Sequence, residues 1–194
     1  MIELYDFDIT NSAGEKLHRE LRMTYLPNGL RIARFMPLGD PKLCEFVGKE
    51  LAKRIPAGTQ ALLMPDGKAQ AILHVMGRES GLPTYVARKE HKPYMGDVIE
   101  GKAHSVTSTK VQPFYLMEED AREMAYKKIA IFDDVVSSGS TIEAMRDILS
   151  QIERVTETGV LCVATEGDLR PDVISLTHLP ISGTLNTTPR KMVG

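Results

Sequence analysis

The stretch Ile129-Ala-Ile-Phe-Asp-Asp-Val-Val-Ser-Ser-Gly-Ser-Thr141 organises the rest of the chain. Its first four residues form an apolar run typical of a buried strand, and two adjacent carboxylates, Asp133 and Asp134, follow that run. A short turn rich in serine and glycine comes next, and apolar residues then recur at helical spacing from Ile142 to Ile152. The stretch therefore predicts a strand, a turn and a helix whose N-terminus lies beside two carboxylates.

The turn and the start of this helix have the chemistry of an anion site. Ser140, with Glu143 three residues later, predicts a capping box at the first turn of the helix. Free backbone N–H groups and the positive end of the helix dipole favour a phosphate, and the serine and threonine hydroxyls add donors. No Walker phosphate loop occurs in the chain, so a nucleoside triphosphate site of that type is excluded.

The two carboxylates would repel a ligand that consisted of a phosphate alone. They suit a ligand that also carries hydroxyls or a hard cation, and a ribose 5-phosphate meets both requirements. Adjacent strand residues point to opposite faces of a sheet, so one aspartate can bind the ligand while the other is structural. The plainer alternative is a generic strand-to-helix turn with two solvated acids.

Residues 129–141 resemble the binding motif for 5-phosphoribosyl 1-pyrophosphate (PRPP) of type I phosphoribosyltransferases, in which apolar residues and an Asp-Asp pair precede a small-residue loop. The resemblance implies an α/β fold with a central, mostly parallel sheet flanked by helices. It implies that Asp133 and Asp134 are catalytic and bind the ribose hydroxyls, directly or through magnesium-bound water, which makes Mg²⁺ the expected cofactor. It assigns the ribose 5-phosphate to the residues that follow the aspartates: Val135, Val136, Ser137, Ser138, Gly139, Ser140 and Thr141.

Two earlier strands are expected to bring further residues to the same site. The apolar runs 61–64 and 84–87 predict buried strands with a helix at 69–76 between them. Such an order requires a parallel crossover, and ligands in parallel sheets collect at the carboxyl ends of strands. The family resemblance assigns the pyrophosphate of PRPP to the residues that follow these strands: Asp66, Gly67, Lys68, Arg88 and Lys89. The Asp66 carboxylate would repel pyrophosphate unless magnesium intervenes or the side chain points away.

Residues 90–108 are polar, carry no clear period and predict a long irregular loop. Type I phosphoribosyltransferases have a flexible catalytic loop at this place, which closes over PRPP. Residues 105–110 resemble a Ser/Thr-rich signature in this loop of xanthine phosphoribosyltransferases. The resemblance makes Lys110 a catalytic residue that meets the pyrophosphate on closure.

The chain is expected to divide into three parts. Residues 1–36 predict a small β appendage, because Asn28-Gly29 between two apolar runs is a hairpin signal. Its role is either to cover an apolar sheet face or to form part of the base pocket. Residues 37–185 form the expected phosphoribosyltransferase core, and residues 186–194 are expected to be a flexible tail.

Composition narrows the class of protein. The chain has 194 residues, 42% of them hydrophobic, which is enough for one buried core. A net charge of −2 without a basic stripe argues against nucleic-acid binding. Cys44 and Cys162 lie in apolar patterns and predict buried thiols. With no signal peptide and no membrane-length apolar span in the sequence, we expect a cytoplasmic protein without a membrane partner.

The base is the least determined part of the prediction. Hypoxanthine–guanine enzymes carry an aspartate where this chain has Ser137, which disfavours that subfamily. The run 36–43 resembles the segment before the first core helix of adenine phosphoribosyltransferases, so adenine is favoured, xanthine is next and orotate is less favoured. The expected partners are PRPP, a nucleobase and, by family resemblance, a second copy in a homodimer. A PRPP-sensing regulator of the same fold and a phosphoribosyltransferase for an unusual, non-salvage base stay open.

Overall fold

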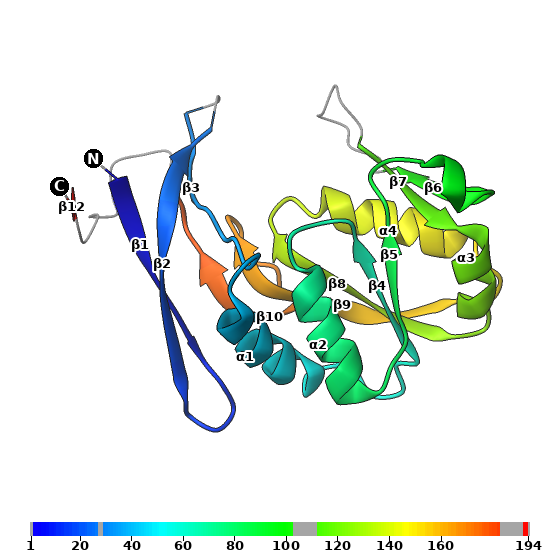
Figure 1. The fold of residues 1–194 in the computed structure, drawn as a ribbon, viewed down its shortest axis with the longest axis horizontal. Coiled ribbons are helices and arrows are strands. Elements are labelled where there is room, and N and C mark those ends of the chain that lie inside the picture. The colour runs from blue at the N-terminus through cyan, green and yellow to red at the C-terminus, as the bar shows by residue number, and fades with distance from the viewer. Residues whose placement is uncertain (1, 27–28, 103–111, 183–191, 194) are drawn as a thin grey trace.

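The computed structural model describes residues 2–26, 29–102, 112–182 and 192–193. A sheet of five parallel strands lies at its centre, in the order β10-β9-β8-β4-β5 (Figure 1). These strands are Ala61–Pro65 (β4), Thr84–Ala87 (β5), Lys128–Val136 (β8), Thr156–Glu166 (β9) and Val173–Leu179 (β10). The predicted α/β class with a central parallel sheet is therefore confirmed.

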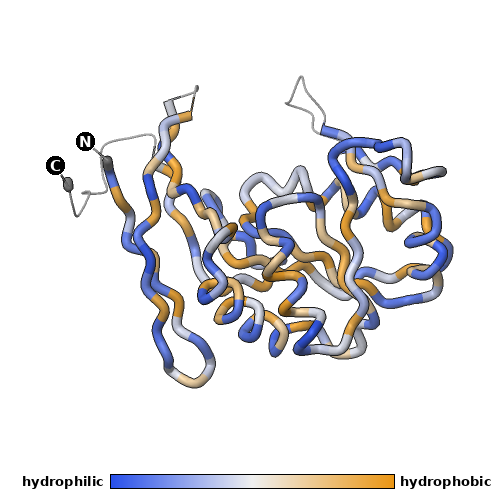
Figure 2. Tube along the Cα trace, in the orientation of Figure 1, coloured by the Kyte–Doolittle hydropathy of each residue, from blue (hydrophilic) through white to orange (hydrophobic). Residues whose placement is uncertain are grey.

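Helices cover both faces of this sheet. One face packs against α1 (Pro41–Ala52) and α2 (Gln70–Ser80). The other packs against α4 (Ser140–Ser150), α3 (Glu118–Met124) and the hairpin of β6 (Val98–Lys102) with β7 (Pro113–Met117). All five residues of β4 are buried, because a strand covered on both faces has no solvent side. Figure 2 shows the result as hydrophobic central strands and a more hydrophilic outer ribbon at the N-terminus.

The strand order reverses between β4 and β8. Strand β5 lies on one side of β4, whereas the chain returns to the other side for β8 and continues outward through β9 and β10. In open parallel sheets a ligand crevice forms at such a reversal, outside the carboxyl ends of the strands. The segments that leave these two ends are residues 66–69 and 137–139, which contain the predicted site residues Asp66–Lys68 and Ser137–Gly139.

A second, antiparallel sheet forms the N-terminal part. Its order is β11-β3-β2-β1-β12, with β1 (Ile2–Thr10), β2 (Lys16–Tyr25), β3 (Arg31–Ala33), β11 (Ile181–Ser182) and β12 (Met192–Val193). The expected hairpin is present as β2 paired with β3, although residues 27 and 28 of its turn lie outside the described part. Within the expected tail, β12 pairs with Ile2 and Glu3, so these two tail residues belong to a sheet.

Part of the stretch predicted as irregular, residues 90–108, is regular. It contains a short 3-10 turn, Pro93–Met95, and the strand β6. Gly101, which marks a loop by composition, lies inside β6. A Cβ there would come within 2.4 Å of the Ala144 carbonyl oxygen, so this glycine lets β6 approach α4 closely. The prediction of an irregular segment was wrong for residues 98–102 for this reason.

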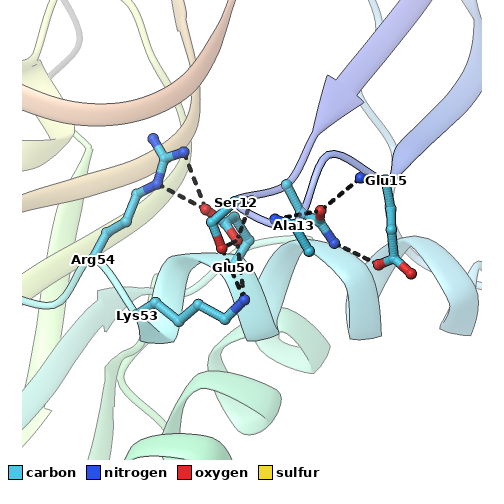
Figure 3. A network of polar contacts seen from close by, with 7 residues as sticks. Ser12, Ala13, Glu15, Glu50, Lys53 and Arg54 are labelled. Carbon is cyan, nitrogen blue, oxygen red and sulfur yellow. Dashed lines mark hydrogen bonds and ion pairs between the residues drawn. The ribbon is translucent and has the colours of Figure 1, made fainter.

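A buried carboxylate fastens the N-terminal sheet to the core (Figure 3). Glu50 of α1 is only 2% exposed, and it accepts hydrogen bonds from the backbone N–H and the hydroxyl of Ser12, each at 3.0 Å. Lys53 and Arg54, which directly follow the end of α1 at Ala52, form ion pairs with the same carboxylate. Arg54 also donates to the carbonyl of Ser175 in β10 at 3.3 Å. The turn between β1 and β2, the helix α1 and the edge of the central sheet are thereby joined.

Two further expectations concern the two cysteines and the length of the helices. Cys44 and Cys162 are buried free thiols, as their apolar surroundings predicted. Burial raises the pKa of the Cys162 thiol to about 12, which makes it unreactive near neutral pH. Among the described residues, no helix has both the length and the apolar character needed to cross a membrane.

Candidate active site

The turn between β8 and α4 encloses a small cavity. Gly139 precedes the first helical residue and has φ of +83°, a left-handed backbone that glycine adopts without strain. The cavity has a volume of about 30 Å³ and is lined by Asp133 and residues 135–142. The first N–H groups of a helix have no partner within the helix, so this end of α4 offers donors to an anion.

The predicted capping box is wrong. Because α4 begins at Ser140, the capping position belongs to Gly139, which has no side chain to accept a hydrogen bond. The Glu143 carboxylate instead accepts a hydrogen bond from Arg146 at 2.7 Å. The Ser140 N–H has only a long contact of 3.4 Å with the Ser138 hydroxyl. The helix end is thus less satisfied by its own side chains than the sequence suggested, which favours a ligand there.

Asp133 and Asp134 are both buried at the end of β8, with 8% and 9% of their surface exposed. Following the alternation of the strand, Asp133 continues the row of Ile131, which packs on the α4 side, and Asp134 continues the row of Phe132 on the opposite side. Burial and the Asp134 carboxylate raise the pKa of Asp133 well above its ordinary value, and Lys89 works in the other direction. Ionised Asp133 is therefore costly without a partner that binds it.

Asp134 has a carboxylate oxygen with unused capacity. Its Oδ1 accepts a hydrogen bond from the Val135 N–H at 2.9 Å, whereas its Oδ2 is buried and accepts none within the described chain. The ammonium of Lys68 lies 3.4 Å from Oδ2 and donates to the carbonyl of Phe35 at 3.1 Å. One lysine thus connects the loop after β4, the aspartate pair on β8 and the segment that leaves the N-terminal sheet.

Asp66 and Arg88 face each other across the ends of β4 and β5. Arg88 Nε lies 3.6 Å from Asp66 Oδ2, and Gln70 donates to Asp66 Oδ1 at 2.7 Å. The Asp66 charge is therefore balanced by a neighbouring cation. The charge of Lys89 acts on Asp133. Of the predicted pyrophosphate residues, Lys68 and Lys89 thus act on the aspartate pair at the end of β8, and Asp66 and Arg88 pair with each other at the neighbouring strand ends.

Lys110 and the rest of segment 103–111 lie outside the described residues, so the role of Lys110 stays a prediction. The segment connects β6 and β7, whose ends the structure does describe.

Sequence reasoning passed over Arg170, which reaches the turn between β8 and α4 from the segment after β9. Its Nη1 lies 3.4 Å from the carbonyl oxygen of Ser137, and its guanidinium packs against Gly139. Residues 166–171 gave only the composition of a polar loop, and no local signal indicated that this arginine would meet residue 137 across the sheet.

A larger hollow of about 870 Å³ lies away from the strand ends. It runs along α1 beneath the turn between β1 and β2, and it is lined by Asn11, Ala13, Phe46 and several charged residues. Its size does not make it the active site, because Asp133, Asp134 and the open N-terminus of α4 lie elsewhere, and its own buried carboxylate, Glu50, is already paired with Lys53 and Arg54.

Comparison with known proteins shows which enzymes the chain resembles in sequence. No protein-family profile matches the chain. It is 25% identical over 133 residues to the hypoxanthine/guanine phosphoribosyltransferase of Methanothermobacter thermautotrophicus, covering 69% of this chain and 65% of that protein. The enzyme of the same name from Methanothermobacter marburgensis is also 25% identical, over 136 residues. The chain thus spans about two thirds of the length of each of these relatives.

Solved structures give the same answer for the fold. An adenine phosphoribosyltransferase from Thermoanaerobacter pseudethanolicus superposes with a TM-score of 0.61 at 17% identity, covering 73% of this chain and 83% of that one. The Saccharomyces cerevisiae enzyme, solved with an imino-altritol bisphosphate and adenine, has a TM-score of 0.59 at 16% identity, and the match covers 90% of this chain and 94% of that one. The chain has the fold of the type I phosphoribosyltransferases, and its resemblance to the purine enzymes of that family is confirmed.

Proposed function

We propose that this protein transfers a 5-phosphoribosyl group from PRPP to a purine base, giving the nucleotide and pyrophosphate. The observation that carries the proposal is the buried pair Asp133 and Asp134 beside the open N-terminus of α4, at the reversal of the strand order. The helix end fits the 5-phosphate and the carboxylates fit the ribose hydroxyls. Lys68, Arg88 and Lys89 fit the pyrophosphate at the neighbouring strand ends.

The chemistry follows from this placement. Residues 137–141 hold the 5-phosphate through backbone N–H groups and hydroxyls. Asp133 and Asp134 accept hydrogen bonds from the ribose hydroxyls, which fixes the sugar between its two anionic ends. The bond that breaks is a glycosidic C–O bond, so positive charge develops on the ribose ring, and the two aspartates lie where they can stabilise it. Lys110, on the segment outside the described residues, would meet the leaving pyrophosphate when that segment closes.

A magnesium ion fits the residues that are present. The orphaned oxygen Asp134 Oδ2 and the buried Asp133 carboxylate are hard oxygen donors of the kind that Mg²⁺ accepts, directly or through water. When bound with PRPP, the ion supplies charge neutralisation to the pyrophosphate leaving group. Lys68, 3.4 Å from Asp134, holds a positive charge at the same carboxylate in its absence.

For the base, adenine is our first choice and xanthine the next. The run 36–43 and the fold shared with adenine enzymes support adenine, and Ser137 departs from the aspartate expected of hypoxanthine–guanine enzymes. Hypoxanthine and guanine come after these two as candidates, because the curated relatives are named for them. The contact of Lys68 with the Phe35 carbonyl supports a role for the end of the N-terminal sheet beside the substrate, where it would contact the base.

The test is pyrophosphate release from PRPP and Mg²⁺ with adenine, xanthine, hypoxanthine, guanine, orotate and uracil supplied one at a time. Turnover with one purine supports the proposal and names the base. Tight PRPP binding without turnover on any of the six would favour a PRPP sensor or an unusual base. The proposal also includes a homodimer in the cytoplasm, and sedimentation analysis of the purified chain tests the dimer.

A further inference from the structure

Arg170 contacts the loop of residues 137–139, which is part of the proposed 5-phosphate site. The residue lies in the segment between β9 and β10, 33 positions along the chain from the loop carbonyl that it contacts at 3.4 Å, that of Ser137. A Cβ placed on Gly139 would come within 2.4 Å of Arg170 Nη1 and 3.2 Å of both Cζ and Nη2. The guanidinium therefore packs against the glycine backbone, and any larger residue at position 139 would displace it.

Asp172 fixes the direction of this guanidinium. Arg170 donates to Asp172 through Nε at 2.9 Å and through Nη2 at 2.7 Å, which is the two-pronged contact that orients an arginine most strictly. The Arg170 side chain is 21% exposed, whereas that of Asp172 is 47% exposed. The fork leaves Nη1 free to face the loop.

Helix stability does not explain a cation at this place. The N-terminus of a helix carries a partial positive charge, so a cation beside it is disfavoured. An arginine has five N–H donors, and the contacts with Asp172 and Ser137 use three of them within the described chain. The remaining donors lie at the loop whose amides fit a phosphate.

We propose that Arg170, oriented by Asp172, is a positioning residue that holds the 137–139 loop in the conformation that binds the 5-phosphate of the phosphoribosyl substrate. The inference rests on the proposed function, since it concerns the same loop. Nη1 contacts the Ser137 carbonyl, and the guanidinium packs against the Gly139 backbone directly before the first residue of α4.

The test compares two ligands that use different ends of the site. Ribose 5-phosphate carries the 5-phosphate, whereas pyrophosphate with Mg²⁺ reports on Lys68, Arg88 and Lys89. Both are titrated by calorimetry into the full chain and its variants. Arg170→Ala should weaken ribose 5-phosphate by roughly 10- to 100-fold, the range for a lost hydrogen bond to a charged group, and leave pyrophosphate within about twofold. In turnover assays the KM for PRPP should rise while kcat changes little.

Further variants separate position from charge. Arg170→Lys keeps the charge but cannot form the fork with Asp172, so it should bind ribose 5-phosphate almost as weakly as Arg170→Ala. Asp172→Asn should weaken binding in the same direction. Arg78→Ala breaks a similar fork with Glu45 on α1, away from the site, and should bind both ligands like the parent chain.

Two results would overturn the inference: unchanged ribose 5-phosphate affinity in a folded Arg170→Ala chain, or full affinity in Arg170→Lys. A parent chain that binds neither ligand would instead count against the proposed function itself.

Discussion

Replacing Asp133 by asparagine should make the protein more stable while it loses its substrate. The side chain is 8% exposed, and burial together with the Asp134 carboxylate raises the pKa of Asp133. Asparagine keeps the oxygen that accepts a hydrogen bond from the Asp134 N–H at 2.8 Å, but it removes the charge. It therefore removes the cost of a buried anion without removing the local hydrogen bond.

The size of the gain follows from that cost. Burying a polar group without full compensation costs about 1–3 kcal/mol in mutational data. In a protein of this length each kcal/mol shifts Tm by roughly 2–4 °C, so Asp133→Asn should raise Tm by about 2–12 °C at pH 8. The gain depends on pH. Because the pKa is raised in the folded state, the folded chain holds an extra proton above the ordinary value of 3.8, and its free energy of unfolding falls as pH rises through that window.

Thermal unfolding at pH 4 and pH 8 checks this reasoning. The difference in Tm between Asp133→Asn and the parent chain should be small at pH 4 and larger at pH 8. Asp97→Asn, which removes an exposed carboxylate, should show no such change. A variant that is less stable than the parent at pH 8 would refute the assignment of Asp133 as a strained, ligand-binding carboxylate, because it would show that the charge stabilises the fold.

Three other substitutions test separate parts of the structure. Glu50→Gln should lower the free energy of unfolding by about 1–3 kcal/mol in denaturant titrations. This is less than the loss expected for a fully buried ion pair, because Arg54 is partly exposed. Stability equal to that of the parent would contradict the proposal that Glu50 joins the N-terminal sheet to the core. Gly139→Ala places a side chain at φ of +83° and against the Arg170 guanidinium, so it should cost about 1–3 kcal/mol of stability and raise the KM for PRPP. A KM equal to that of the parent would be inconsistent with 5-phosphate binding by the 137–139 loop. Lys68→Ala leaves Asp134 without its nearest cation and should weaken pyrophosphate by roughly tenfold, as measured by calorimetry, whereas unchanged affinity would remove Lys68 from the site.

The central motif was predictable because its signal is local. An apolar run, two carboxylates and a small-residue turn lie within 13 consecutive residues, and the strand alternation that separates Asp133 from Asp134 is a property of any strand. The parallel sheet followed from the strand–helix–strand order, which leaves few topologies. The hairpin at Asn28-Gly29 was likewise encoded in neighbouring residues.

The failures have a common physical cause, which is contact between residues far apart in the chain. Arg170 reaches a loop 33 residues away, and Glu50 of α1 accepts hydrogen bonds from Ser12, 38 residues earlier. Strand β6 pairs with β7, and Gly101 lets it approach α4 closely, whereas the composition of this segment indicates a loop. The capping box failed for a smaller reason, since the helix begins at Ser140 itself, one residue earlier than a cap at Ser140 requires.

The most direct test of the central claim is a calorimetric titration of PRPP with Mg²⁺ into the parent chain and into the double variant Asp133→Asn with Asp134→Asn. The account predicts binding by the parent and none by a folded double variant, because both carboxylates that hold the ribose are gone. Equal affinity in the two folded proteins would contradict the claim that this buried pair is the PRPP site.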